Sequence, residues 1–160
     1  VMKTFNMTRP MTAAMGLGLA KAALDFTRDE LEKAGVSLDY GRGTANQSAA
    51  AERFMRLEAL YEASELTTLR ATWLAGAGKP NNMESSVCKA HAGGAVRQIT
   101  QGCVDLLGPM GISRDHLLEK WMRDCRITDI YEGTGEIQRL IIARGPASYT
   151  HLTLPTILLL

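Results

Sequence analysis

The spacing of apolar residues is the feature that most restricts how this sequence can fold. Along most of its length they recur every three or four positions, which is the period of an amphipathic helix. Hardly any segment alternates apolar and polar residues with the period of two that marks a half-buried strand. The first stripe, within residues 9–33, consists of Ala13, Leu17, Ala20, Leu24 and Leu31. Pro10 suits the first turn of this helix, where a missing N–H costs nothing, and Gly35 suits its end.

Two further long helices are predicted beyond the polar segment 41–47. The stripe of the second consists of Phe54, Leu57, Tyr61, Ser64, Thr68, Ala71 and Ala75. Residues 76–82 then break the helical pattern with glycine, proline and asparagine. The stripe of the third consists of Cys88, His91, Ala95, Ile99, Cys103 and Leu106, and residues 108–111 end it.

The last helices are shorter. One is expected from Asp115 to Asp124, with Leu118 and Trp121 buried. The final helix is expected after Thr134, whose hydroxyl is a good N-cap. Its apolar residues are Ile137, Leu140, Ile141 and Ala143.

Helices joined by short loops predict an all-α fold, an antiparallel helical bundle of the four-helix up-and-down type with a short additional helix. We assign residues 1–144 to this bundle. Residues 145–160 differ in character, because the stretch from Leu152 to Leu160 is uncharged and has no helical period. We expect this tail to be foreign to the domain and to pack poorly against it.

Composition excludes several classes of function. A formal net charge of +1 gives no electrostatic reason to expect nucleic acid or an anionic membrane surface as a partner. The sequence has no run of about eighteen apolar residues, so no membrane span is expected, and its start shows no signal-peptide pattern. Cys88, Cys103 and Cys125 are odd in number and widely spaced, which argues against a disulfide framework. We interpret them as reduced thiols in a cytoplasmic or matrix-like compartment.

A metal site is not predicted. Cys88 and His91 lie three positions apart on a helix and could share one ion, but no second pair has matching spacing. The simpler interpretation is a helix face packed in the core.

Glu132 is the residue that points most directly to chemistry. It is a carboxylate in a glycine-containing turn just ahead of a helix, where many acidic residues only favour the helix dipole. Ile130 and Tyr131 are apolar neighbours, and Gly133 permits close approach by another molecule. A carboxylate desolvated by an apolar ligand becomes a stronger base towards carbon acids. The residues alone leave both interpretations open.

The stretch around Glu132 closely resembles the C-terminal signature of the acyl-CoA dehydrogenase family. In that signature an Arg-Asp pair precedes Ile-Tyr-Glu-Gly-Thr, found here at 130–134, and Ile-Gln-Arg-Leu-Ile follows at 137–141. A second match is Phe-Asn-Met-Thr-Arg-Pro at 5–10, which is similar to the family's Phe-Asp-x-Thr-Arg-Pro segment. The two matches bracket nearly all of residues 5–144.

The resemblance implies a flavin-dependent enzyme that oxidises an acyl-CoA thioester to a 2-enoyl-CoA, of which this chain is the C-terminal helical portion. Glu132 would remove the α-proton of the substrate, and FAD would accept the β-hydride. Thr8, Arg9, Tyr131 and Gly133 would contact the substrate. Arg9 could alternatively be an ordinary helix-start residue.

The resemblance also implies contacts to FAD, from Thr134, Glu136, Asp105 and Gly108. Departures from the family pattern fall mainly in the segments that would hold the pyrophosphate and adenosine. Asp105 stands where glutamine is common, and Pro109 replaces the second glycine of a Gly-Gly turn. Residues 39–42 occupy the place of the usual Arg-x-x-Phe-Gly segment. These departures do not touch Glu132.

The partners implied by the resemblance are acyl-CoA, an electron-transfer flavoprotein as electron acceptor, and further copies of the enzyme in a homodimer or homotetramer. The compartment would be the bacterial cytoplasm or the mitochondrial matrix. Family enzymes carry two domains before this bundle, so we expect this chain alone to be inactive. Two alternatives are a non-catalytic helical oligomerisation module and a relative with a different substrate, such as a nitroalkane or an aromatic acyl group. The presence of Glu132 favours the enzyme.

Overall fold

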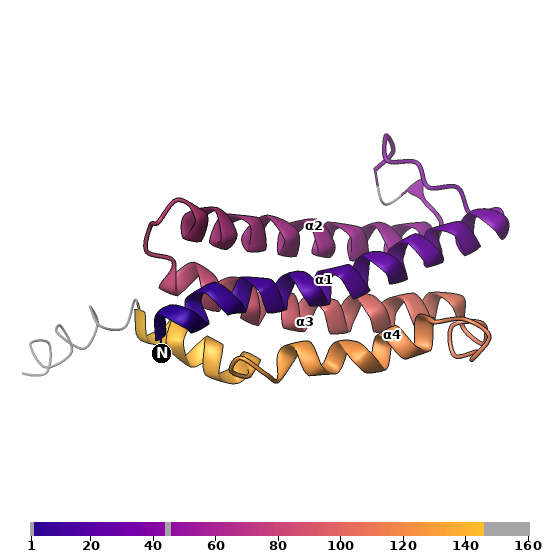
Figure 1. Ribbon diagram of the computed structural model, residues 1–160. Helices are drawn as coiled ribbons and strands as arrows, with labels where there is room; N and C mark the ends of the chain where they lie inside the picture. Colours follow the sequence, from indigo (N-terminus) through magenta and orange to yellow (C-terminus); the bar gives the residue numbers. More distant parts are fainter. Residues whose placement is uncertain (1, 44–45, 146–160) are drawn as a thin grey trace, which may run out of the picture.

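The computed structural model describes residues 2–43 and 46–145. Of the predicted tail 145–160, Gly145 ends the last helix and the rest lies outside the described residues. The helices are α1 (Met2–Lys33), α2 (Ala49–Gly76), α3 (Asn82–Leu107) and α4 (Leu118–Asp124), followed by the 3-10 helix η2 (Cys125–Asp129) and a helix over residues 135–145. In Figure 1, α1, α2 and α3 lie side by side with alternating chain direction, and α4 begins a fourth row that ends near the start of α1. The described residues contain no strand. The predicted all-α antiparallel bundle is therefore confirmed.

The start of α1 differs from the prediction. The helix begins at Met2, so Pro10 lies inside it rather than in its first turn. A proline has no N–H to offer the carbonyl four residues earlier, which here is that of Asn6. Asn81 Nδ2 donates to this oxygen at 2.9 Å. The compensating donor is 75 positions away in sequence, which explains why local spacing could not reveal it.

The predicted end of α1 at Gly35 agrees with the structure. Gly35 has a φ of +77°, a conformation that costs glycine little. The Val36 N–H donates to Leu31 O and the Gly35 N–H to Glu32 O, both at 2.9 Å. These two bonds form a Schellman motif that satisfies carbonyls at the end of the helix.

The core is built around α3, which contacts α1, α2, α4 and η2. Cys88, Ala95, Ile99 and Cys103 of its predicted stripe are buried, whereas His91 is half-buried. Small residues allow neighbouring helices to approach α3 closely. The largest fully buried apolar side chains are Phe54, Ile99 and Leu118. No helix within the described residues is long and apolar enough to cross a membrane.

The final row of the bundle differs from the prediction in where α4 begins and in which face of the last helix is buried. α4 begins at Leu118, after the turn that contains Asp115. In the helix over 135–145, the expected apolar residues Ile137 and Leu140 are 49% and 53% exposed. Gly135 and Gln138 occupy the buried side instead. The reason is the close approach of η2, because a Cβ at position 135 would lie only 2.6 Å from Asp129 Oδ1.

The cysteines are free and buried, in agreement with their interpretation as packed thiols. Burial raises the pKa of Cys88 to about 12 and that of Cys103 to about 11. Both thiols therefore stay neutral in the folded chain, whereas an unfolded thiol ionises at about pH 8.5. Their contribution to stability is therefore complete below that pH and is lost as the pH rises towards the folded values.

We expect the thiols of the folded chain to resist Ellman's reagent at pH 8, because only the thiolate reacts and all three thiols are buried away from the reagent. All three should react once the chain is unfolded in denaturant. The absorbance of the released thiolate measures this. Rapid reaction of Cys88 or Cys103 in the native chain, located by mass spectrometry, would contradict the observed burial.

Candidate active site

Glu132 lies where the sequence placed it, on the turn between η2 and the helix over 135–145. Its φ is +62°, and it is the only described non-glycine residue in the left-handed region. Gly133 follows with a φ of +94°. A left-handed non-glycine residue costs of the order of 1–3 kcal/mol and persists only where its surroundings hold it. The contacts that hold this turn therefore define the site.

Two neighbouring residues of α1 reach the turn. Thr8 Oγ1 donates to Glu132 Oε2 at 2.7 Å, and Arg9 Nε donates to the backbone oxygen of Glu132 at 3.5 Å. The segments that resemble the family at the two ends of the sequence thus meet in space. In Figure 1 the C-terminal helix, drawn in yellow, lies beside the start of α1. Thr8 therefore fixes one oxygen of the carboxylate, and Arg9 fixes the backbone behind it.

Arg9 is buried inside α1, so its alternative interpretation as a helix-start residue is wrong. Its NH1 donates to Asn6 Oδ1 at 3.5 Å and to Ser86 Oγ at 3.4 Å. Its guanidinium also lies 5.6 Å from the centre of the Phe5 ring. Burial lowers the pKa of Arg9, and the charge of Glu132 opposes that shift. Arg9 thus joins the site to α3 through Ser86.

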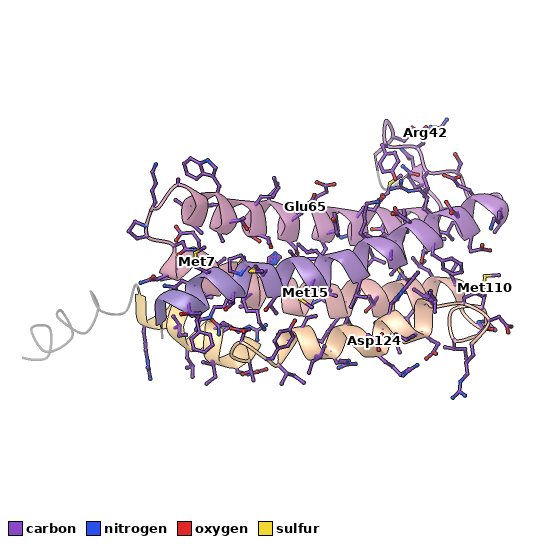
Figure 2. The ribbon with its side chains drawn as sticks, viewed as in Figure 1. Met7, Met15, Arg42, Glu65, Met110 and Asp124 are labelled. Carbon is purple, nitrogen blue, oxygen red and sulfur yellow. The ribbon has the colours of Figure 1, made fainter. Side chains whose placement is uncertain are left out.

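The outer side of the turn is apolar. Tyr131 Oη donates to Met15 Sδ at 3.4 Å. Met15 and Met7 lie on the exposed side of α1, where both are labelled in Figure 2. Ile130, the residue before Tyr131, is also exposed. Tyr131, the residue before Glu132, thus packs beside an exposed methionine of α1.

Thr134 caps the final helix as predicted, with its Oγ1 accepting from the Ile137 N–H at 3.4 Å. Glu136 is exposed. Its own backbone N–H and the Thr134 hydroxyl lower the pKa of the Glu136 carboxyl. Both side chains thus act on the N-terminus of this helix.

Two buried charges beneath the turn were not predicted. Lys89 of α3 is fully buried, and Asp129 of η2 is buried beside Gly93 of α3. Arg97 NH2 lies 3.5 Å from Asp129 Oδ2. Burial lowers the pKa of Lys89, and the charge of Asp129 opposes that shift. The available sequence signal was a lysine next to Cys88 within a stripe of otherwise small and apolar residues.

Asp105 and Gly108 lie away from this site. Both are at the C-terminal end of α3, near Met110, which Figure 2 shows at the opposite end of the bundle from Met7. Asp105 accepts from Arg53 NH2 at 2.7 Å and from Gln101 Nε2 at 2.9 Å. The structure thus brings Thr8, Arg9, Tyr131, Gly133 and Thr134 together around Glu132 and leaves Asp105 and Gly108 apart.

Cys88 and His91 do not form a metal pair with other ligands. The Cys88 thiol donates to Ser85 O at 3.3 Å. Among the residues described, no group of three or more histidine, cysteine and acidic side chains is placed to hold a metal ion.

Comparisons with known proteins identify the family of this all-helical domain. The sequence model of the family described as "Acyl-CoA dehydrogenase, C-terminal domain" matches residues 1–146. The short-chain specific acyl-CoA dehydrogenase of Clostridium acetobutylicum is 34% identical over 145 residues, which cover 89% of this chain and 37% of the relative. The mitochondrial short-chain specific acyl-CoA dehydrogenase of Mus musculus is 34% identical over 142 residues, which cover 89% and 34%.

A solved structure gives the same result. The butyryl-CoA dehydrogenase of Megasphaera elsdenii superposes with a TM-score of 0.80 and 26% sequence identity, over 90% of this chain and 37% of that one. The chain belongs to the acyl-CoA dehydrogenase family. It spans little more than a third of the length of these relatives.

Proposed function

We propose that this chain is the C-terminal domain of a flavin-dependent acyl-CoA dehydrogenase that converts an acyl-CoA thioester to the 2-enoyl-CoA. The observation that carries the proposal is Glu132, held in a left-handed turn with one carboxylate oxygen bonded to Thr8. Strained residues of this kind concentrate at active sites, where the surrounding structure holds them. The names of the relatives add the substrate class, because both sequence relatives are short-chain specific acyl-CoA dehydrogenases.

In this proposal Glu132 is the general base that removes the α-proton of the thioester. Thr8 holds Oε2, which leaves Oε1 to accept the proton. Arg9 keeps the backbone of the turn in place from behind. Tyr131 and Gly133, on either side of Glu132 in the turn, flank the thioester. A general base must lie within hydrogen-bond reach of its proton, so the fixed orientation of the carboxylate is what makes the turn useful.

FAD, when bound, supplies the acceptor for the β-hydride. Gly133 and Thr134 fit a contact with it, because they stand at the N-terminus of a helix, where Thr134 is the N-cap. Glu136 and Asp105 fit a phosphate contact poorly, since both are acidic. Asp105 pairs with Arg53, so a cation lies beside this carboxylate. We therefore propose Thr134 as the stronger flavin contact and assign Glu136 to capping the helix.

The proposed partners are acyl-CoA, an electron-transfer flavoprotein that reoxidises the flavin, and further copies of the enzyme. Assembly is supported by an apolar face on α2, where Leu66, Leu69 and Trp73 are 58–64% exposed. Apolar surface of this kind is typical of interfaces. The alternative of an oligomerisation module explains this face but gives no reason for the strained turn at Glu132. The two named sequence relatives are a bacterial and a mitochondrial protein, and we propose the cytoplasm or the mitochondrial matrix as the compartment.

The full-length enzyme should lose its oxidised-flavin absorbance when butyryl-CoA is added without oxygen, and 2-butenoyl-CoA should form in equal amount. Stopped-flow absorbance and chromatography of the thioesters measure the two. A flavoprotein that binds FAD but is not reduced by butyryl-CoA or by longer acyl-CoA thioesters would contradict the proposed reaction.

A further inference from the structure

Gln138 stands directly beneath the Glu132 turn. It lies one turn into the final helix, and its side chain is fully buried. Its Nε2 donates to Gly133 O at 3.2 Å and to Glu132 O at 3.4 Å. A Cβ at position 133 would lie 2.4 Å from the same nitrogen, so the amide is packed directly against the turn. One side chain thus binds both carbonyls of the strained segment.

The orientation of the amide follows from these contacts. A carboxamide offers two N–H donors on one side and an acceptor oxygen on the other. If the group were flipped, Gln138 Oε1 would face two carbonyl oxygens with no donor between them. In the observed orientation Oε1 is buried and has no hydrogen-bond partner among the described residues. Two donated bonds to the turn on one side of the amide thus stand against one unpaired oxygen on the other.

No other described side chain binds both carbonyls. Arg9 reaches only the oxygen of Glu132, at 3.5 Å, and Thr8 reaches only the carboxylate. Without Gln138, the left-handed conformation of Glu132 would lose its double anchor and could relax towards ordinary backbone angles. The carboxylate would then turn away from Thr8.

We propose that Gln138 is a positioning residue, which holds the Glu132–Gly133 turn in its left-handed form and thereby aims the Glu132 carboxylate at the substrate. This inference rests on the proposed function of Glu132. Gln138 itself touches neither substrate nor flavin in the proposal, and acts only through the backbone of the turn.

Gln138→Met tests the inference in the full-length enzyme, because methionine has a similar volume and no donor. Displacement of a reacting group by about 1 Å can cost about a hundredfold in rate, so we expect flavin reduction by butyryl-CoA to fall by about ten- to a hundredfold. The apparent dissociation constant of butyryl-CoA, obtained from the concentration dependence of flavin reduction, should change by less than about threefold. Gln98→Met makes the same change at an exposed position of α3 and should behave as wild type.

A second measurement reports on the turn without using activity. Hydrogen exchange followed by mass spectrometry should show faster exchange in peptides covering residues 131–136 of Gln138→Met, and unchanged exchange in α2. Gln138→Asn keeps an amide but is one methylene too short to reach both carbonyls. The asparagine variant serves the same purpose if the methionine variant folds poorly. Its rate of flavin reduction and its hydrogen exchange at residues 131–136 should lie between those of wild type and Gln138→Met.

A double-mutant cycle separates positioning from a general structural effect. If Gln138 acts through Glu132, adding Gln138→Met to Glu132→Gln should cause little further loss of rate, because the base is already gone. Additive losses, or unchanged rate and exchange in Gln138→Met, would overturn the inference. Glu132→Gln alone tests the proposed function separately. If that variant is slow while Gln138→Met is normal, only the role of Gln138 fails.

Discussion

Glu132→Gln should slow the reduction of enzyme-bound flavin by acyl-CoA by about 10²–10⁴-fold, the range that general-base catalysis typically contributes. Glutamine keeps the shape of the side chain and removes the proton acceptor. Thr8 Oγ1, which donates to Glu132 Oε2, can donate equally to the amide oxygen of the variant. Stopped-flow absorbance under anaerobic conditions measures the rate in the full-length enzyme.

Flavin content and substrate binding should largely survive in this variant. The bonds to the backbone of the turn come from Arg9 and Gln138, and neither involves the carboxylate. Glu62→Gln is the matched control, because it makes the same substitution at an exposed position of α2. A normal rate in Glu132→Gln would move the base to another residue. A slow rate accompanied by loss of flavin would mean that the carboxylate is needed for folding of the site rather than for proton transfer.

The helices could be predicted from sequence because their signals are local. The apolar period predicts three long helices, and Gly35 marks the end of the first through a bond pattern confined to a few neighbouring residues. The prediction for Pro10 was wrong because its position depends on a contact that is distant in sequence. Its position inside α1 depends on Asn81, a side chain from a different helix that donates to the carbonyl the proline leaves without a partner.

The residues of the site also fall into two groups, those that the sequence signature points to and those that only the packing reveals. Glu132, Thr8 and Arg9 stand out in the sequence through their resemblance to a family signature, and the structure brings them together. Lys89 and Asp129 lack such a signal, and Gln138 lies inside the signature without a role that the resemblance implies, because a buried polar residue is recognised only by what surrounds it. Gln138 in particular lies among isoleucines whose apolar character suggested the opposite face of the helix. Packing against η2, where only glycine fits at position 135, decided which face is buried.

The largest expected effect on stability comes from the other end of the bundle. Phe54 of α2 is fully buried in the core, and the guanidinium of Arg28 lies 5.8 Å from the centre of its ring. Phe54→Ala removes the aromatic ring and leaves a cavity between α2 and its neighbours. Substitutions of this kind lower the free energy of unfolding by about 3–5 kcal/mol. Urea denaturation of the 160-residue chain, followed by circular dichroism, measures the change.

Glu62→Ala is the control for this loss, because Glu62 lies on the same helix, is exposed and is not part of the apolar face of α2. Its effect should stay within about 0.5 kcal/mol. A loss below about 1 kcal/mol for Phe54→Ala would show that the core collapses to fill the cavity or that the ring is less enclosed than observed.

Phe54→Ala should also leave the chemistry of the folded molecules unchanged. Within the part of the chain that the structure describes, no hydrogen bond to Glu132 comes from α2, since the donors lie on α1 and on the final helix. Hydrogen exchange at residues 131–136 should therefore match wild type under conditions where the variant is folded, and flavin reduction per folded enzyme should do the same. A loss of rate in fully folded Phe54→Ala would show that the core at this end also shapes the turn. The expected contrast is that Glu132→Gln loses rate with little loss of stability, while Phe54→Ala loses stability with little loss of rate.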